Sequence, residues 1–196
     1  VNNESLDYGH FFLTFGFNYV EGLRLRIGGR TYFCRNYIWR LECFMSYGFR
    51  DDKFKYWISG KWLLDKKNRL IISGWNRRDV EQIGASLTTS TDVLGRSLAS
   101  SSVVGTGTND KLTSINLTSF AIEMEPWRHF ILRLGANYRT LESASDTFSL
   151  DYFDDESPSG IASEVKQFET TLSMSYFPGR KMTGFGVERH DANDDY

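Results

Sequence analysis

Histidine and cysteine, the residues most used for catalysis and metal binding, are few and scattered in this 196-residue chain. The histidines are His10, His129 and His190, and no His-x-x-x-His or Cys-x-x-Cys spacing is present. Cys34 and Cys43 are close enough in sequence to pair, but two thiols are too few for a disulfide scaffold or a zinc site. We expect both to be packing residues. The sequence therefore predicts no metal and no cofactor.

Three short segments resemble the beginning of a catalytic or ligand-binding motif, and each lacks an essential part. Gly105-Thr106-Gly107 begins like a nucleotide loop but has neither a third glycine nor a following helix. The segment 191–195 begins like a calcium loop, yet Tyr196 stands where such a loop needs glycine. The carboxylates of 151–156 have no apolar surroundings to shift their pKa, so we interpret them as a solvated loop. No Gly-x-Ser-x-Gly elbow is present either. We predict a protein that is not an enzyme.

Four charged residues are placed so regularly that they require an explanation. Arg24 and Arg26 alternate with leucine and isoleucine, and Arg40 and Glu42 alternate with aromatic and aliphatic residues. If the apolar residues contact lipid, these charges face the lumen of a barrel, because a charge on the lipid side costs about 2–4 kcal/mol at mid-membrane. They would either hydrate and brace the lumen or take part in gating and substrate passage. The sequence favours bracing.

The composition favours strands and excludes some classes of function. The chain contains 15 Phe, 10 Tyr and 5 Trp but only 3 Pro, and flat side chains suit a pleated surface. The formal charge of −2 argues against a general nucleic-acid binder. No apolar run approaches the roughly 20 residues of a membrane helix. That absence does not decide the class, because membrane strands alternate and keep the mean hydropathy low.

Alternation of apolar and polar residues is the main structural signal along the chain. It is clearest where Arg40, Glu42 and Ser46 oppose an apolar series that runs from 37 to 47. Similar segments predict about eight strands in up-and-down order. Short connections such as 65–68 and 125–128 contrast with long polar loops at 86–111 and 141–163. We therefore predict an all-β, antiparallel up-and-down transmembrane β-barrel, in which 1–196 is part of a single domain.

The lengths of the alternating segments agree with a membrane. From Tyr37 to Tyr47 is roughly 33 Å of strand, or roughly 25 Å of membrane normal when tilted by about 40°. Aromatic residues stand near the ends of such segments, as in an interfacial aromatic girdle: Tyr37, Trp39, Tyr47, Tyr138, Phe168 and Tyr176. The side chains expected to face lipid between them are Leu41, Met45, Leu132, Leu134, Leu172 and Met174. Alternation alone also fits a lipocalin-like barrel or a soluble sandwich with the apolar face inside.

Four segments in order carry a family resemblance: Val20-Glu21-Gly22-Leu23-Arg24-Leu25-Arg26-Ile27-Gly28-Gly29, Tyr47-Gly48-Phe49-Arg50-Asp51-Asp52-Lys53-Phe54-Lys55-Tyr56, Asp79-Val80-Glu81-Gln82-Ile83-Gly84 and Ser175-Tyr176-Phe177-Pro178-Gly179-Arg180. The order resembles a family of Bacteroidetes-type outer-membrane proteins of uncharacterised function. Members usually carry a carboxypeptidase-regulatory-like domain before a large barrel that is distantly similar to BamA/TamA-type barrels. The resemblance implies a location in the bacterial outer membrane, with membrane lipid and other outer-membrane or periplasmic proteins as partners.

The chain is expected to be a piece of a larger barrel. It begins at Val1 without a signal peptide, and 190–196 lacks the alternation of a final barrel strand. We expect about eight to ten strands that do not close by themselves. The leading hypothesis is a non-enzymatic barrel that assists insertion or export of proteins. The alternatives are a passive or gated solute pore, and a soluble β-sandwich or barrel that binds carbohydrate or protein.

Overall fold

The computed structural model describes residues 2–3, 6–8, 15–18, 20–31, 38–82, 112–144, 149–154, 160–179, 181–183, 186–187 and 189–191. Ten strands form one sheet: β1 (Asn2–Asn3), β2 (Leu6–Tyr8), β3 (Phe15–Asn18), β4 (Gly22–Thr31), β5 (Trp39–Gly48), β6 (Lys53–Asp65), β7 (Leu70–Gln82), β8 (Leu112–Trp127), β9 (Phe130–Ser143) and β12 (Glu164–Tyr176). Two separate hairpins pair β10 (Tyr152–Phe153) with β11 (Ile161–Ala162) and β13 (Met182–Thr183) with β14 (His190–Asp191). The prediction of an all-β chain is confirmed.

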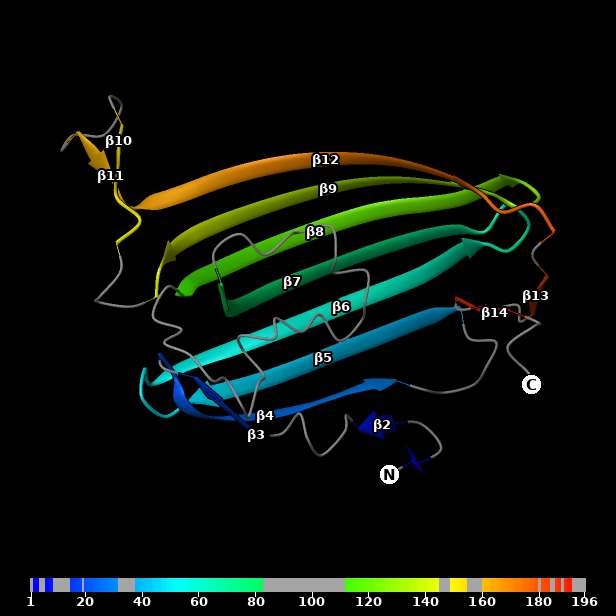
Figure 1. The fold of residues 1–196 in the computed structure, drawn as a ribbon. Coiled ribbons are helices and arrows are strands. Elements are labelled where there is room, and N and C mark those ends of the chain that lie inside the picture. The colour runs from blue at the N-terminus through cyan, green and yellow to red at the C-terminus, as the bar shows by residue number, and fades with distance from the viewer. Residues whose placement is uncertain are drawn as a thin grey trace.

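The strands of the large sheet follow one another in up-and-down order, as the alternation predicts. Every strand pair of this sheet in the described residues is antiparallel. The order runs from β1 and β2 through β4, β5, β6, β7, β8 and β9 to β12, with β3 also paired to β4 (Figure 1). Within the described ranges β12 pairs only with β9, so the sheet is open and no closed barrel forms.

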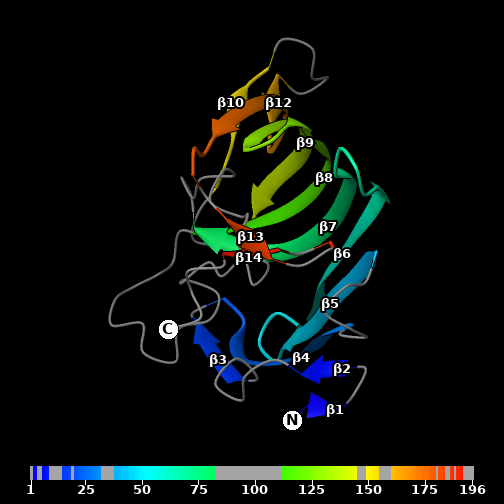
Figure 2. The same ribbon diagram turned by 90° about the vertical axis from the view of Figure 1, so that its right-hand side faces the viewer.

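The sheet curves strongly across its strands. Viewed along the strands, the sheet forms an open arc with a concave and a convex face (Figure 2). Side chains alternate between these faces because the strand repeat is two residues. On β5 the side chains of Arg40, Glu42 and Ser46 are buried on the concave face, whereas those of Leu41 and Met45 are exposed on the convex face. The inside of this curved sheet is therefore more polar than its outside.

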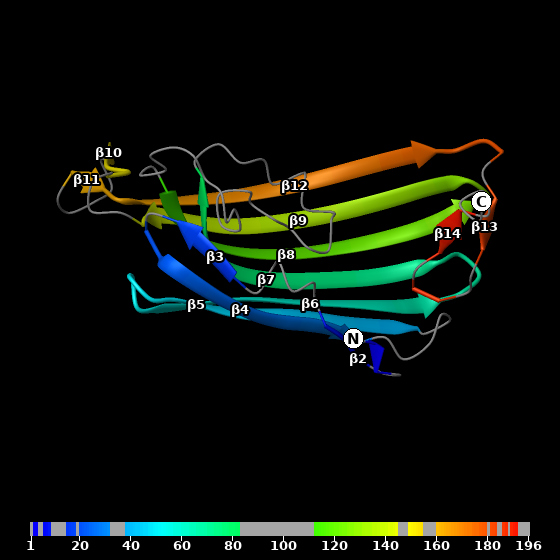
Figure 3. The same cartoon turned by 60° about the horizontal axis from the view of Figure 1, so that its bottom comes forward.

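The two ends of the strands differ in their connections. At one end, here the turn end, 66–69 joins β6 to β7 and 128–129 joins β8 to β9. At the other, here the loop end, the turn 49–52 joins β5 to β6, and the longer connections 83–111 and 144–163 leave β7 and β9. The hairpin β10–β11 lies at the loop end and β13–β14 at the turn end (Figure 3). The predicted loop 141–163 is shorter than expected, because β9 continues to Ser143.

The turn between β8 and β9 differs in position from the prediction. Sequence reasoning placed it at 125–128, but β8 continues through Trp127 and the turn is Arg128-His129. The pairing with β9 shifts between Met124 and Trp127, so Pro126 stands where no ladder hydrogen bond is required of it. His129 takes a positive φ of 68°, which closes the short turn.

Apolar packing inside the curve is limited to small groups. Ile115 and Leu117 of β8 are almost fully buried on the concave side. Leu63, Ile71 and Val187 form one cluster at the turn end. Helices long and apolar enough to cross a membrane do not occur in the described part of the chain.

Candidate functional site: two faces of opposite character

The convex face exposes large apolar side chains on nearly every strand. They include Phe15 and Phe17 of β3, and their exposure is high, reaching 69 % for Trp127 of β8. The set carried by the strands of the large sheet is Phe15, Phe17, Leu23, Ile27, Trp39, Leu41, Met45, Phe54, Tyr56, Ile58, Trp62, Leu64, Phe120, Trp127, Leu134, Tyr138, Phe168, Leu172, Met174 and Tyr176. A water-soluble monomer rarely exposes so large a continuous apolar surface. We call this set the apolar belt.

Paired aromatic residues bound the apolar belt on the β5–β6 hairpin. Trp39 lies directly opposite Trp62, and Tyr47 lies opposite Phe54, with ring centroids 4.8 Å apart for the second pair. Eight residues separate the two aromatic positions on each strand. That spacing corresponds to roughly 26 Å along the strand.

The β9–β12 hairpin repeats this arrangement with different residues. Phe130 lies opposite Tyr176, and Tyr138 lies opposite Phe168, again with eight residues between the aromatic positions on each strand. Between them stand only smaller or aliphatic convex residues, including the directly paired Leu134 and Leu172. Two distant hairpins therefore carry an apolar segment of the same length with the same aromatic boundaries.

The boundary of the belt is slanted relative to the strands. In the strand registers Trp62 lies opposite Ile72, Ile72 opposite Ile122, and Ile122 opposite Leu134. Phe130 therefore lies four residues further toward the turn end than the row of Trp62. Four residues are roughly 13 Å along a strand, and the centres of the two hairpins are four strand spacings apart, roughly 19 Å. If the boundary is level, the strands are tilted by about 35°. Membrane barrels have tilts of roughly 35–45°.

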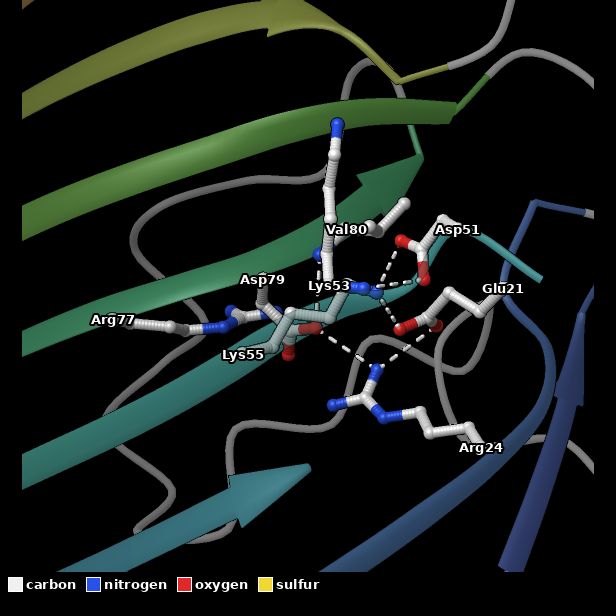
Figure 4. Close-up of polar contacts among 8 residues, drawn as sticks. All are labelled: Glu21, Arg24, Asp51, Lys53, Lys55, Arg77, Asp79 and Val80. Carbon is white, nitrogen blue, oxygen red and sulfur yellow. Dashed lines mark hydrogen bonds and ion pairs between the residues drawn. The ribbon is translucent and has the colours of Figure 1, made fainter. Parts of the chain in front are cut away.

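The concave face carries a buried ion-pair network at the loop end (Figure 4). Arg24 of β4 donates hydrogen bonds to Glu21, at 3.2 Å, and to Asp79 of β7, at 2.9 Å. The Nζ atom of Lys55 on β6 lies 2.6 Å from Glu21 and 2.5 Å from Asp51. Because the side chains of Glu21, Arg24, Lys55 and Asp79 are at least nine-tenths buried, their charges depend on one another for compensation.

The network joins strands that are not neighbours in the sheet. β5 and β6 stand between β4 and β7, yet Arg24 reaches Asp79 directly. Arg77, two residues before Asp79, adds a contact of 3.4 Å to the same carboxylate. Such contacts across the concave side are possible only because the sheet is curved. The network therefore braces the curvature at the loop end.

Further charges line the concave face away from this network. Arg40 and Glu42, neighbours on the inner side of β5, form an ion pair and are both buried. The guanidinium of Arg26 lies 3.5 Å from the centre of the Phe44 ring, and Phe44 stacks on Trp57 with centroids 5.9 Å apart. These contacts combine charge with aromatic surface on the inner side of the sheet.

At the turn end, the segment before β14 is held against the sheet by Arg69. Its Nη1 and Nη2 atoms donate to the carbonyl oxygens of Gly186 and Val187, both at 3.0 Å. Arg189 also pairs with Glu125. Partial burial and the neighbouring guanidinium of Arg189 lower the pKa of Arg69. Arg69 nevertheless remains charged at neutral pH, because guanidinium groups titrate only at very high pH.

The predicted inward charges and the described residues of the predicted aromatic girdle lie on opposite faces of the sheet. Arg24, Arg40 and Glu42 are buried on the concave face in ion pairs, and Arg26 faces the same side. Trp39, Tyr138, Phe168 and Tyr176 are exposed on the convex face, and Tyr47 is partly exposed there. Tyr37, Cys34, His10, the segment 105–107 and the loop 86–111 lie outside the described residues.

Five members of the network were missed by sequence reasoning: Glu21, Asp51, Lys55, Arg77 and Asp79. Glu21, Lys55 and Asp79 are far apart in the chain, and Glu21 belongs to a turn rather than to an alternating strand. Lys55 and Asp79 stand on the polar side of alternating segments, which indicates from the sequence that they face inward. Nothing in their spacing indicates that they meet.

In the described part of the chain, no group of three or more His, Cys, Asp or Glu side chains could hold a metal ion. Cys43 is a free, exposed thiol on the convex face. Comparison of the chain with protein-family models, curated proteins and solved structures gave no match. Function must therefore be argued from the two faces of the sheet.

Proposed function

We propose that the sheet forms part of the wall of an outer-membrane β-barrel without enzymatic activity. In this proposal the apolar belt contacts lipid and the concave face borders a water-filled interior. The observation that carries it is the pair of aromatic boundaries, eight residues apart on both the β5–β6 and the β9–β12 hairpins. At a tilt of about 35°, this length covers roughly 21 Å of membrane normal, close to the roughly 25 Å band of such barrels.

The distribution of polarity argues against the soluble alternatives. A soluble sandwich or lipocalin-like barrel buries its apolar face and exposes its polar one. Here the buried face contains Arg24, Arg40 and Glu42, and the exposed face contains Trp62 and Leu172. Lipid is the environment that gives both faces suitable partners. The open edge at β12 must then be paired by further strands, because hydrocarbon cannot satisfy free N–H and C=O groups.

The polar interior favours passage of hydrophilic solutes as the activity of this barrel. Charged side chains of β4, β5, β6 and β9 face the concave side, and those of Lys53, Lys61, Arg133 and Arg139 are exposed or partly exposed there, where water and solute could reach them. A role in the insertion or export of other proteins remains a prediction that rests on the family resemblance. The two roles are distinguished by conductance, which a solute pore must show in a planar bilayer.

Cys43 offers a direct test of the membrane location. It is midway between Trp39 and Tyr47 on the convex face, and its thiol is exposed and free. In the full-length protein, with Cys34 replaced by serine, a fluorophore on Cys43 should be quenched by spin-labelled lipid. A fluorophore on the matched variant Cys43→Ser/Lys67→Cys, at the exposed turn end, should be quenched by aqueous reagents instead. Strong aqueous quenching at Cys43 in reconstituted vesicles would contradict the proposal.

A further inference from the structure

Charge is distributed unevenly between the concave face and the rest of the chain. The whole chain has a formal charge of −2. Among the strand residues whose side chains are described, nine cationic ones lie on the concave face, against four acidic ones: Arg24, Arg26, Arg40, Lys53, Lys55, Lys61, Arg77, Arg133 and Arg139 against Glu42, Asp79, Glu123 and Glu169. The turn residues Glu21 and Asp51 bring the acidic total to six. The described side chains of the concave face therefore carry a net positive charge, although the chain as a whole is acidic.

Most of the concave cations are already engaged by the protein. Arg24, Lys55 and Arg77 belong to the ion-pair network, and Arg40 pairs with Glu42. Arg139 is held by Gln167 on the neighbouring strand. Lys61 of β6 and Arg133 of β9 differ from these, because neither has a hydrogen bond or ion pair within the described structure.

The floor between Lys61 and Arg133 is built from short side chains. The register row that contains Lys61 continues through Ser73, Ala121 and Gly135, and Arg133 stands two residues from Gly135. Long cationic side chains on both sides of such a floor can extend toward solute in the interior. Glu123 lies beside Arg133 in the register but is not within ion-pair distance of it. Arg40 lies directly opposite Lys61, and the charges of Glu42 and Glu123 also act on Lys61, so two acids face three cations in this part of the sheet.

We propose that Lys61 and Arg133 form a binding site for small oxyanions, such as carboxylates or phosphate, on the inner wall of the barrel. The inference rests on the proposed function and adds a substrate class to it. Two cationic groups attract a passing anion and repel a passing cation, and the guanidinium of Arg133 can bind two oxygens at once. Buried ion pairs compensate Arg24, Arg40, Lys55 and Arg77, whereas Lys61 and Arg133, like Lys53 at the loop end, have no ion pair in the described structure. The two therefore contribute to the sign of the selectivity.

The primary test is the reversal potential of the reconstituted full-length protein in a potassium chloride gradient. The wild type should prefer chloride over potassium. A unit charge about 4 Å from an ion changes its local concentration about fivefold in water, so the double variant Lys61→Gln/Arg133→Gln should lose several-fold in anion preference. Lys166→Gln is the matched control, because Lys166 is exposed on the convex side beyond the aromatic boundary. An unselective or cation-selective wild type would overturn the proposal, as would equal effects of the double variant and the control.

A second measurement decides the matter if the protein does not conduct. Amine modification of Lys61, followed by mass spectrometry of the full-length protein folded in detergent, should be slowed by inorganic phosphate. Acetate should act in the same direction if the site accepts oxyanions in general. Modification of Lys166 should be unaffected at the same ionic strength. Equal rates at Lys61 with and without phosphate would refute the anion site, whereas loss of conductance alone would count only against the pore.

Discussion

Arg24 of β4 lies 2.9 Å from Asp79 of β7, although β5 and β6 separate their strands in the sheet. Three strand spacings correspond to roughly 14 Å in a flat sheet, and two side chains on the same face would not meet over that distance. Curvature closes the gap on the concave side. The ion pair and the curvature therefore depend on each other, and this dependence can be measured.

Replacement of Asp79 by asparagine should destabilise the protein strongly. The change keeps the size of the side chain but leaves two buried guanidinium groups, Arg24 and Arg77, without their shared carboxylate. Loss of one partner from a buried ion pair costs about 3–5 kcal/mol. Urea unfolding of the reconstituted protein, followed by tryptophan fluorescence, measures this loss. Glu164→Gln, which breaks a solvent-exposed pair with Lys166, should have a much smaller effect.

Gly28 is required by the close approach of β4 and β5. A Cβ atom added there would lie 2.5 Å from the Cβ of Phe44 and 2.7 Å from the carbonyl oxygen of Cys43. We expect Gly28→Ala to lower the free energy of unfolding by about 1–3 kcal/mol. Gly60→Ala is the control, since its Cβ would have no atom within 4 Å and alanine loses less entropy on folding. If both variants unfolded at the same urea concentration, the packing at Gly28 would be described wrongly.

The effect of a charge on the convex face should depend on its position along β9. Leu134 is midway between Phe130 and Tyr138, so Leu134→Arg places a guanidinium at the centre of the belt. Such a change costs about 2–4 kcal/mol at mid-membrane and about 0–1 kcal/mol near the interface. Leu134→Arg should therefore be more destabilising in vesicles than Tyr138→Arg. Equal losses at both positions would count against lipid as the environment of this face.

Loss of the Arg69 guanidinium should release the segment that precedes β14. Two charged hydrogen bonds hold the carbonyl groups of Gly186 and Val187, and each such bond contributes about 1.5–3 kcal/mol. Hydrogen exchange in 182–191 should accelerate at least roughly tenfold in Arg69→Gln. Lys67→Gln changes an exposed residue of the same turn and should leave the exchange unchanged. Protection that persisted in Arg69→Gln would show that other contacts hold the segment.

Only some of the aromatic residues that bound the apolar belt could be predicted from the sequence. Tyr47, Tyr138, Phe168 and Tyr176 were recognised because they end alternating segments. The matching role of Trp62 became evident only from the register, which places it opposite Trp39. Strand pairing between distant segments is a tertiary property, so the slant of the belt could not be predicted from alternation along single strands.

The sequence by itself determined the strands, their up-and-down order and the side of each strand that carries charge. These properties follow from a two-residue repeat that any extended segment must obey. Tertiary structure decided which charges meet. Arg24 was singled out from its neighbours in sequence, but its partners Glu21 and Asp79 depend on a turn that folds inward and on curvature over four strands. The same holds for Lys61 and Arg133, which are 72 positions apart in the chain. They face one inner surface because β7 and β8 pair between β6 and β9, with short side chains in the register row of Lys61.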